Sequence, residues 1–204
     1  IDKVEADDII AYLSKSVITH PKDKSFIISS DKDFLQLVSE NVIVYRPMEK
    51  EYYTPQTVID KYKMSPHNFI LHKTLLGDNS DKIKGVKGLG EKGLLKKFPE
   101  LLDKNMCWDD ILDICESKIS DHVVYARIIH GRDDLEKNYK IMDLSNPMLS
   151  KEDKEWLDEI VLSKDLPYYP DQFVSMYNED QIGGLIRNLE FWVKDCFENL
   201  VIKK

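Results

Sequence analysis

Three short clusters of carboxylates contain the residues of this sequence that are best suited to chemistry. They are Glu5-Ala6-Asp7-Asp8, Asp31-Lys32-Asp33 and Asp78-Asn79-Ser80-Asp81. The seven carboxylates of these clusters would repel one another strongly if they converged without cations. Oxygen-rich sites of this kind suit Mg²⁺ or Mn²⁺ rather than zinc. Two such ions about 4 Å apart can stabilise both the attacking and the leaving oxygens of a phosphodiester.

Each cluster taken alone also has a purely structural interpretation. Acids in the first turn of a helix are favoured by the helix dipole, Asp31 suits a cap at a strand-to-helix turn, and the third cluster suits a turn. Their common placement favours the chemical interpretation, because ligands of open parallel sheets bind at the carboxyl ends of the strands. No grouping of serine, cysteine and histidine residues suggests a different catalytic site, and the five histidines are scattered along the sequence.

A basic, glycine-rich segment follows the third cluster. Residues 82–97 carry six lysines and one glutamate, a net charge of +5 inside a chain of net charge −8. Gly85, Gly88 and Gly90 would let backbone N–H groups approach a phosphate just before a helix begins. A solvated lysine face beside a flexible turn is the alternative. The spacing G-V-K-G-L-G between two expected helices favours a helix-hairpin-helix that binds the nucleic-acid backbone without reading sequence.

The elements that must position these residues follow from the hydrophobic pattern. We expect a helix over 4–17, a strand over 26–28, a short helix over 34–38, and strands over 41–45 and 51–53, which together indicate an α/β sheet. Thr54-Pro55 and Ser65-Pro66 each predict a capped helix start, and the second of these helices should end at Leu76 before Gly77. Helices are then expected over 91–98, 101–117, 121–139, 151–162 and 180–202, with loops at 146–150 and 166–172.

Composition limits the class of protein. The 204 residues are 42% hydrophobic and 32% charged, which is typical of a soluble globular chain. The net charge of −8 excludes a simple basic DNA-coating protein, and no apolar run approaches the roughly 18 residues that a membrane span needs. Three cysteines without C-x-x-C spacing indicate reduced thiols in a cytoplasmic protein. Because the chain begins at Ile1 rather than Met, we expect it to start in the middle of a longer product.

The three acidic clusters, in this order and followed by this hairpin, resemble the structure-specific 5′-nucleases. That family includes flap endonucleases, the 5′-nuclease domain of bacterial DNA polymerase I, and phage exonucleases and ribonuclease H-type enzymes. The matching strings are residues 4–11, 28–37 and 76–90, and the resemblance covers about residues 2–98. The short form of the first two clusters is most similar to a phage replication enzyme.

The resemblance implies an α/β fold, in which part of a parallel-sheet, PIN-like nuclease core is followed by a helical helix-hairpin-helix region. It places the end of the metal-binding core at 1–54, the helix-hairpin-helix region at 55–120, and a C-terminal helical region packing on the core at 121–204. It implies Mg²⁺-dependent, two-metal hydrolysis of phosphodiesters near 5′ ends or flap junctions, in DNA replication or RNA primer removal. Mn²⁺ should substitute for Mg²⁺.

The same resemblance assigns roles to single residues. Glu5, Asp7 and Asp8 would join Asp31 around the metal that activates water, and Asp31, Asp33, Asp78 and Asp81 would hold the second metal. The DNA-binding residues would be Lys82, Lys84, Gly85, Val86, Lys87, Gly88, Leu89, Gly90 and Lys92, with K⁺ bound by backbone carbonyls of the hairpin. The partner would be DNA with a 5′ flap, a nick or a free 5′ end, or an RNA–DNA hybrid, together with replication proteins.

The sequence also departs from the family. Relatives carry further aspartates, a central first strand and an arch with a Lys and an Arg before the E-A-D-D string, and Gly93 stands where they often have Thr or Arg. We therefore expect that the chain lacks the N-terminal part of the active site. One alternative is a catalytically silent fragment that binds branched DNA. Another is a metal-dependent phosphatase with a D-x-D motif, which would have no need of the hairpin.

Overall fold

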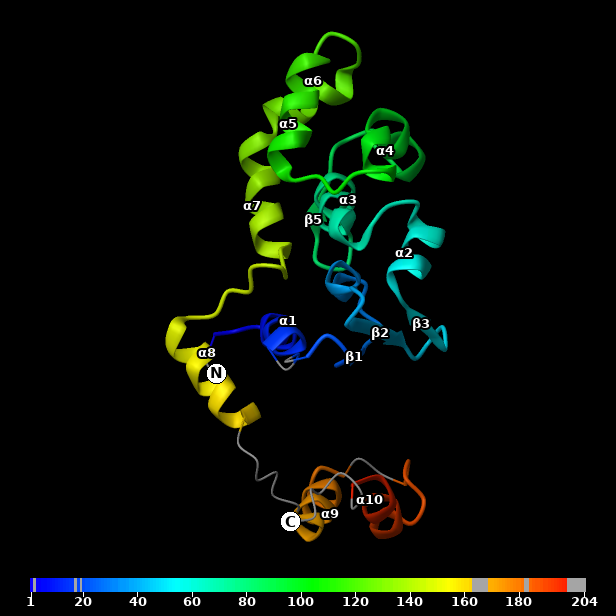
Figure 1. Ribbon diagram of the computed structural model, residues 1–204, viewed down its shortest axis with the longest axis vertical. Coiled ribbons are helices and arrows are strands. Elements are labelled where there is room, and N and C mark those ends of the chain that lie inside the picture. Colours follow the sequence, from blue (N-terminus) through cyan, green and yellow to red (C-terminus); the bar gives the residue numbers. More distant parts are fainter. Residues whose placement is uncertain (2, 17, 19, 163–168, 182–183, 198–204) are drawn as a thin grey trace. The chain divides into compact units, whose positions relative to one another are not determined.

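The computed structural model describes all residues except 2, 17, 19, 163–168, 182–183 and 198–204 (Figure 1). The chain divides into two compact units, Ile1–Lys154 and Glu155–Lys204. The division falls inside the predicted C-terminal region of 121–204. The boundaries predicted at 54 and 120 stay predictions.

The first unit opens with an α/β arrangement. Helix α1 (Ala6–Ser16) is followed by strand β1 (Ser25–Ile28), the 3-10 helix η1 (Asp33–Leu37), and strands β2 (Val42–Arg46) and β3 (Glu51–Tyr53). Strand β1 pairs in parallel with β2, and β3 adds to the other side of β2 in the antiparallel sense. The predicted α/β class is therefore confirmed, and η1 takes the place of the short helix expected at 34–38.

One hydrophobic cluster lies between this sheet and its neighbouring helices. Ile27 and Val44 are paired across β1 and β2, and both are buried together with Phe34 and Leu35 of η1 and Ala11 of α1. Phe26 and Ile28, which alternate with Ile27 along β1, are exposed. The burial of Phe34 and Leu35 pins η1 directly after the carboxyl end of β1, which is the position from which Asp31 and Asp33 project.

Helices α2 (Pro55–Tyr62) and α3 (Phe69–Leu76) come next. Thr54 caps α2 as expected, because its Oγ1 accepts a hydrogen bond of 3.3 Å from the backbone N–H of Thr57. Ser65 occupies the predicted N-cap position with Pro66 next, but its side chain makes no capping hydrogen bond. Ser65 is followed by a 3-10 turn, η2 (Pro66–Asn68), and its hydroxyl donates to Oδ1 of Asn105 at 2.7 Å instead of capping a helix.

The end of α3 at Leu76 agrees with the sequence prediction. A two-stranded ribbon follows, with β4 (Gly77–Asp78) antiparallel to β5 (Ile83–Lys84), and then α4 (Glu91–Lys97). After the 3-10 helix η3 (Pro99–Leu102), helices α5 (Trp108–Ser117), α6 (Val123–His130) and α7 (Arg132–Met142) complete a second hydrophobic cluster. Helix α7 packs beside α3 (Figure 1).

Two of the helix predictions for this region need correction. The helix expected over 101–117 starts only at Trp108, because the chain first makes the 3-10 helix η3. The single helix expected over 121–139 is two helices, α6 and α7, which are divided at Gly131.

The second unit contains α9 (Pro170–Glu179) and α10 (Leu189–Phe197), while α8 (Lys151–Leu162) crosses the boundary and confirms the helix expected there. The rings of Phe173, Trp192 and Phe197 gather between α9 and α10. The loop predicted over 166–172 is wrong from Pro170, which begins α9. The helix predicted over 180–202 is present over 189–197 and wrong over 180–181 and 184–188, and residues 182–183 and 198–202 of it lie outside the described residues. No described helix is long and apolar enough to cross a membrane.

Candidate metal centre and hairpin

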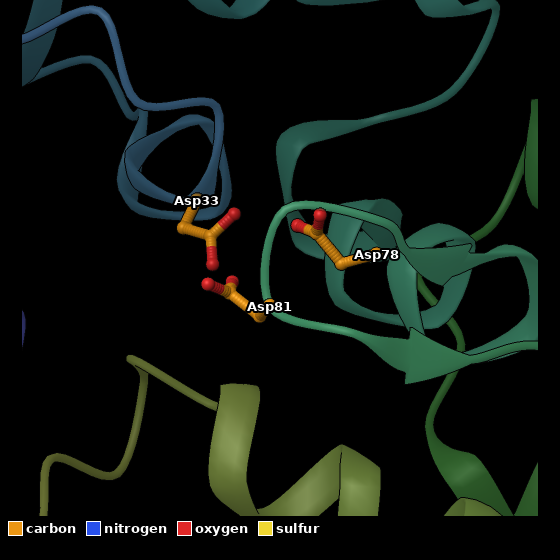
Figure 2. A group of neighbouring side chains, drawn as sticks. All are labelled: Asp33, Asp78 and Asp81. Carbon is orange, nitrogen blue, oxygen red and sulfur yellow. The ribbon is translucent and has the colours of Figure 1, made fainter.

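Asp33, Asp78 and Asp81 meet in space (Figure 2). Each offers one carboxylate oxygen, and these oxygens all lie within 4.8 Å of one another. Asp33 begins η1 after the carboxyl end of β1, Asp78 belongs to β4, and Asp81 lies in the turn between β4 and β5. The second and third acidic clusters of the sequence therefore come together. Among the described residues, this is the only group of three or more potential ligands that is close enough to hold one metal ion.

The turns that carry these aspartates are fixed by their own side chains. Oδ1 of Asp31 accepts a hydrogen bond of 2.9 Å from the backbone N–H of Asp33. Oδ1 of Asp78 accepts one of 2.8 Å from the N–H of Ser80, together with the Ser80 hydroxyl. These are the local bonds by which aspartate stabilises turns. The second and third clusters are therefore local turns, and their aspartates also meet in the acidic group of Asp33, Asp78 and Asp81.

A buried lysine joins the two clusters. Nζ of Lys73, on α3, forms an ion pair with Asp33 and another of 2.6 Å with Oδ2 of Asp78. The Lys73 ammonium, followed by the Ser80 hydroxyl, holds the pKa of Asp78 well below its usual range. Sequence analysis missed Lys73. The available signal was a single lysine in an otherwise mostly apolar helix, five residues before Asp78.

The first acidic cluster adds negative charge from α1. Asp7 has a raised pKa, chiefly because burial disfavours its charged form and then because of the negative charges on Asp31, Glu5, Asp8 and Asp81. Oδ1 of Asp8 accepts a hydrogen bond of 2.8 Å from the backbone N–H of Met148. Asp7 and Asp31 line one groove along β1. Glu5, Asp7, Asp8 and Asp31 do not join the group formed by Asp33, Asp78 and Asp81.

An open cleft of about 490 Å³ borders the aspartates, and Asp31, Asp33, Lys73 and Asp78 line it. Arg46 lines it as well, and its Nη2 donates a hydrogen bond of 2.8 Å to the carbonyl of Ser30, in the turn that carries Asp31. Arg46 is buried and also pairs with Glu49. It is a second residue that sequence analysis missed, and it holds the end of β1 in place.

The donor set fits a hard divalent cation. Every potential ligand in the group is a carboxylate oxygen, the donor that Mg²⁺, Mn²⁺ and Ca²⁺ prefer. The pKa of Asp7 is raised first by burial and then by repulsion from neighbouring carboxylates, among them Asp81 of this group. A cation bound by Asp33, Asp78 and Asp81 would relieve that repulsion.

The hairpin of residues 85–90 is held close to the core. The backbone N–H of Val86 donates a hydrogen bond of 2.8 Å to the carbonyl of Leu75, and Val86 and Leu89 are buried. A Cβ on Gly85 would lie 2.1 Å from the carbonyl carbon of Leu76, so Gly85 permits this close approach. Packing against Leu76 therefore requires a glycine at position 85, and its predicted phosphate-facing role stays a prediction. The four lysines of the predicted interface, Lys82, Lys84, Lys87 and Lys92, are all exposed.

A family model and individual relatives both show similarity to the 5′-nucleases that the acidic strings resemble. Residues 1–63 match the family of 5′-3′ exonuclease N-terminal resolvase-like domains. A 5′-3′ exonuclease of Aquifex aeolicus is 36% identical over 155 residues, which are 73% of this chain and 49% of that protein. The flap endonuclease Xni of Colwellia psychrerythraea is 40% identical over 90 residues, or 44% of this chain and 31% of that protein.

A solved structure has the same fold. The flap endonuclease of bacteriophage T5, determined with DNA and metal ions, superposes with a TM-score of 0.65 at 23% identity, covering 79% of this chain and 60% of that one. The resemblance predicted from the acidic strings is thus confirmed. The chain spans about half the length of the Aquifex relative and smaller shares of the other curated relatives.

Proposed function

We propose that this chain is part of a metal-dependent, structure-specific 5′-nuclease that hydrolyses phosphodiesters near 5′ ends or flap junctions. The convergence of Asp33, Asp78 and Asp81 is the observation that carries the proposal, because it unites two sequence clusters into one cation-sized group of oxygens. The similarity to 5′-3′ exonucleases and flap endonucleases supports it.

In this proposal the seven carboxylates divide between two Mg²⁺ ions, for which Mn²⁺ can substitute. Glu5, Asp7, Asp8 and Asp31 serve the first ion, while Asp31, Asp33, Asp78 and Asp81 serve the second. Bound ions would activate water and stabilise the charge that develops on the phosphodiester. Lys73 orients Asp33 and Asp78 by pairing with both, and the exposed Asp81 completes the group from the turn between β4 and β5.

The hairpin would bind the duplex beside the cleavage point. Lys82, Lys84, Lys87 and Lys92 are exposed cations that can contact phosphates without reading sequence. The partners of the proposal are DNA with a 5′ flap, nick or free 5′ end, RNA–DNA hybrids, and replication proteins. A K⁺ ion bound by hairpin carbonyls belongs to the same proposal, and exchange of K⁺ for Na⁺ in a binding assay tests it.

Cleavage of a 5′-labelled flap duplex tests the function. If the seven carboxylates suffice for a working site, the wild-type chain cuts in Mg²⁺ and not in EDTA, and Asp81→Asn should abolish cutting while retaining binding in Ca²⁺. Asp121→Asn is the matched control, because Asp121 is an exposed aspartate outside the acidic group. Turnover of a chromogenic phosphate monoester with no cleavage of DNA would instead identify a phosphatase and overturn the proposal.

One observation favours a second candidate function. Glu5, Asp7, Asp8 and Asp31 stay outside the group formed by Asp33, Asp78 and Asp81, so only one cation-sized cluster is assembled in the described part of the chain. This supports a branched-DNA-binding chain that does not cleave by itself. It predicts salt-sensitive binding in Ca²⁺ with no product in Mg²⁺.

A further inference from the structure

A groove of about 710 Å³ separates the hairpin from helices α6 and α7. Lys82, Lys84 and Lys87 line its hairpin side, and Arg127, Lys137 and Asn138 line its helical side, with Asp134 as the acidic residue in the lining. The groove therefore carries a clear excess of positive charge. Arg127 and Lys137 lie outside the strings on which the nuclease resemblance rests, residues 4–11, 28–37 and 76–90.

Two side chains cross this groove to the hairpin backbone. Nη1 of Arg127 donates a hydrogen bond of 2.7 Å to the carbonyl of Lys87, and Nδ2 of Asn138 donates one of 3.3 Å to the carbonyl of Lys84. Next to these donors, Ile128 of α6 and Leu135 of α7 are buried in the second hydrophobic cluster. The hairpin is thus bound at two carbonyls to helices that are anchored in the core.

The contact of Arg127 with the hairpin leaves little room for a side chain at position 88, where the chain has a glycine. Its φ of +82° lies in the left-handed region that favours glycine, and a Cβ there would lie 3.0 Å from Nη1 of Arg127. Arg127 also lines the groove together with lysines, and the repulsion between these like charges carries an electrostatic cost. An anion at the groove would relieve that cost.

We propose that Arg127 and Asn138 are positioning residues that hold the hairpin backbone so that Lys84 and Lys87 meet the phosphates of bound DNA. The inference rests on the proposed nucleic-acid function and deepens it. Its physical basis is preorganisation: a hairpin already fixed at the carbonyls of residues 84 and 87 loses less conformational freedom when DNA binds.

Arg127→Met tests the inference, with Arg132→Met as the matched control. Arg132 is an exposed arginine at the start of α7 that does not line the groove. Binding of a fluorescent flap duplex in Ca²⁺ is measured over a range of salt concentrations, and amide hydrogen exchange is measured over residues 84–90. Arg127→Met should weaken binding about three- to tenfold, the size of one lost hydrogen bond, and speed exchange. Arg132→Met should do neither, and Arg127→Lys should recover part of the affinity.

The salt dependence separates positioning from direct contact. A positioning residue lowers affinity and leaves the salt slope unchanged, whereas loss of a direct phosphate contact reduces the slope by about one. A reduced slope with unchanged exchange would therefore overturn the inference, as would affinity and exchange equal to those of the wild type.

Two further results keep the test decisive. If Arg127→Met does not fold, Asn138→Ala removes the other tether, and faster exchange at the Lys84 end is then expected; unchanged exchange would overturn the inference. If the wild-type chain binds no DNA, the proposed function fails, and the hydrogen exchange still decides whether the two side chains tether the hairpin.

Discussion

The ammonium of Lys73 lies 2.6 Å from Oδ2 of Asp78 and pairs at the same time with Asp33. One buried cation on α3 therefore joins the carboxylates of two chain segments that are distant in sequence. This bridge gives the acidic centre a fixed geometry before any metal binds.

Replacing Lys73 by Met should destabilise the metal-free protein by about 3 kcal/mol, because it leaves Asp33 and Asp78 close together and uncompensated. Urea unfolding in EDTA measures the loss. Mg²⁺ should recover more of the free energy of unfolding in this variant than in the wild type. Lys96→Met, at an exposed site on α4, should change stability by less than about 0.5 kcal/mol. Equal losses in the two variants would contradict the bridging role.

Acidification should weaken the Lys73–Asp78 pair. The pKa of Asp78 is lowered in the folded protein, first by Lys73. A group of this kind stabilises the fold above its unfolded pKa, near 3.9, and the stabilisation is lost as pH falls from there through the folded value. The difference in stability between wild type and Asp78→Asn should therefore shrink below about pH 4. Thermal unfolding from pH 7 to pH 2 measures it, and a difference that stays constant with pH would argue against the ion pair.

Asp7 should behave in the opposite sense. Burial and the neighbouring carboxylates raise its pKa, so its contribution to stability is present at low pH and lost as pH rises through the folded value. Asp7→Asn should therefore stabilise the metal-free protein at pH 7 by about 0.5–1 kcal/mol, and much less at pH 3. Thermal unfolding in EDTA at the two pH values tests this. A less stable variant at pH 7 would show that Asp7 is not under electrostatic strain.

Two glycines near the hairpin should respond to alanine with opposite signs. Gly85→Ala brings a Cβ to 2.1 Å from the Leu76 carbonyl carbon and should cost about 1–3 kcal/mol or more. Gly93 lies inside α4, and its Cβ would meet only ordinary contact with Leu89 at 3.5 Å, so Gly93→Ala should gain about 0.5–1 kcal/mol. Chemical unfolding measures the free energy of unfolding of both variants. A lower stability in both would indicate that the hairpin packs differently from this structure.

Local patterns predicted the elements that carry the site. The apolar run Phe26-Ile27-Ile28, the Thr54 cap and the stop at Gly77 each depend on a few adjacent residues, and the corresponding elements are present. The run predicts a buried strand, but only Ile27 of the three is buried. The encounter of Asp33 with Asp78 and Asp81 was expected from strand ends and resemblance, and the structure brings these three together. Whether all seven carboxylates act as ligands stays a prediction.

The misses depend on contacts between segments that are distant in sequence. The role of Lys73 depends on its ion pair with Asp33, and that of Arg46 depends on its hydrogen bond to the Ser30 carbonyl. No sequence spacing predicts either contact. The break at Gly131 interrupts an apolar period that continues on both sides, so that periodicity alone predicted one helix. Pro170 was assigned to a loop although proline is also favoured at the first position of a helix, where α9 uses it.

The most direct test of the central claim is a titration of the chain with Mn²⁺, followed by the electron paramagnetic resonance signal of the free ion. We expect saturable binding by the wild type and by Asp121→Asn, and at least tenfold weaker binding by Asp81→Asn, because that variant removes one of three converging carboxylates. Absence of saturable binding by the wild type, or equal affinity in all three proteins, would contradict a metal centre at Asp33, Asp78 and Asp81.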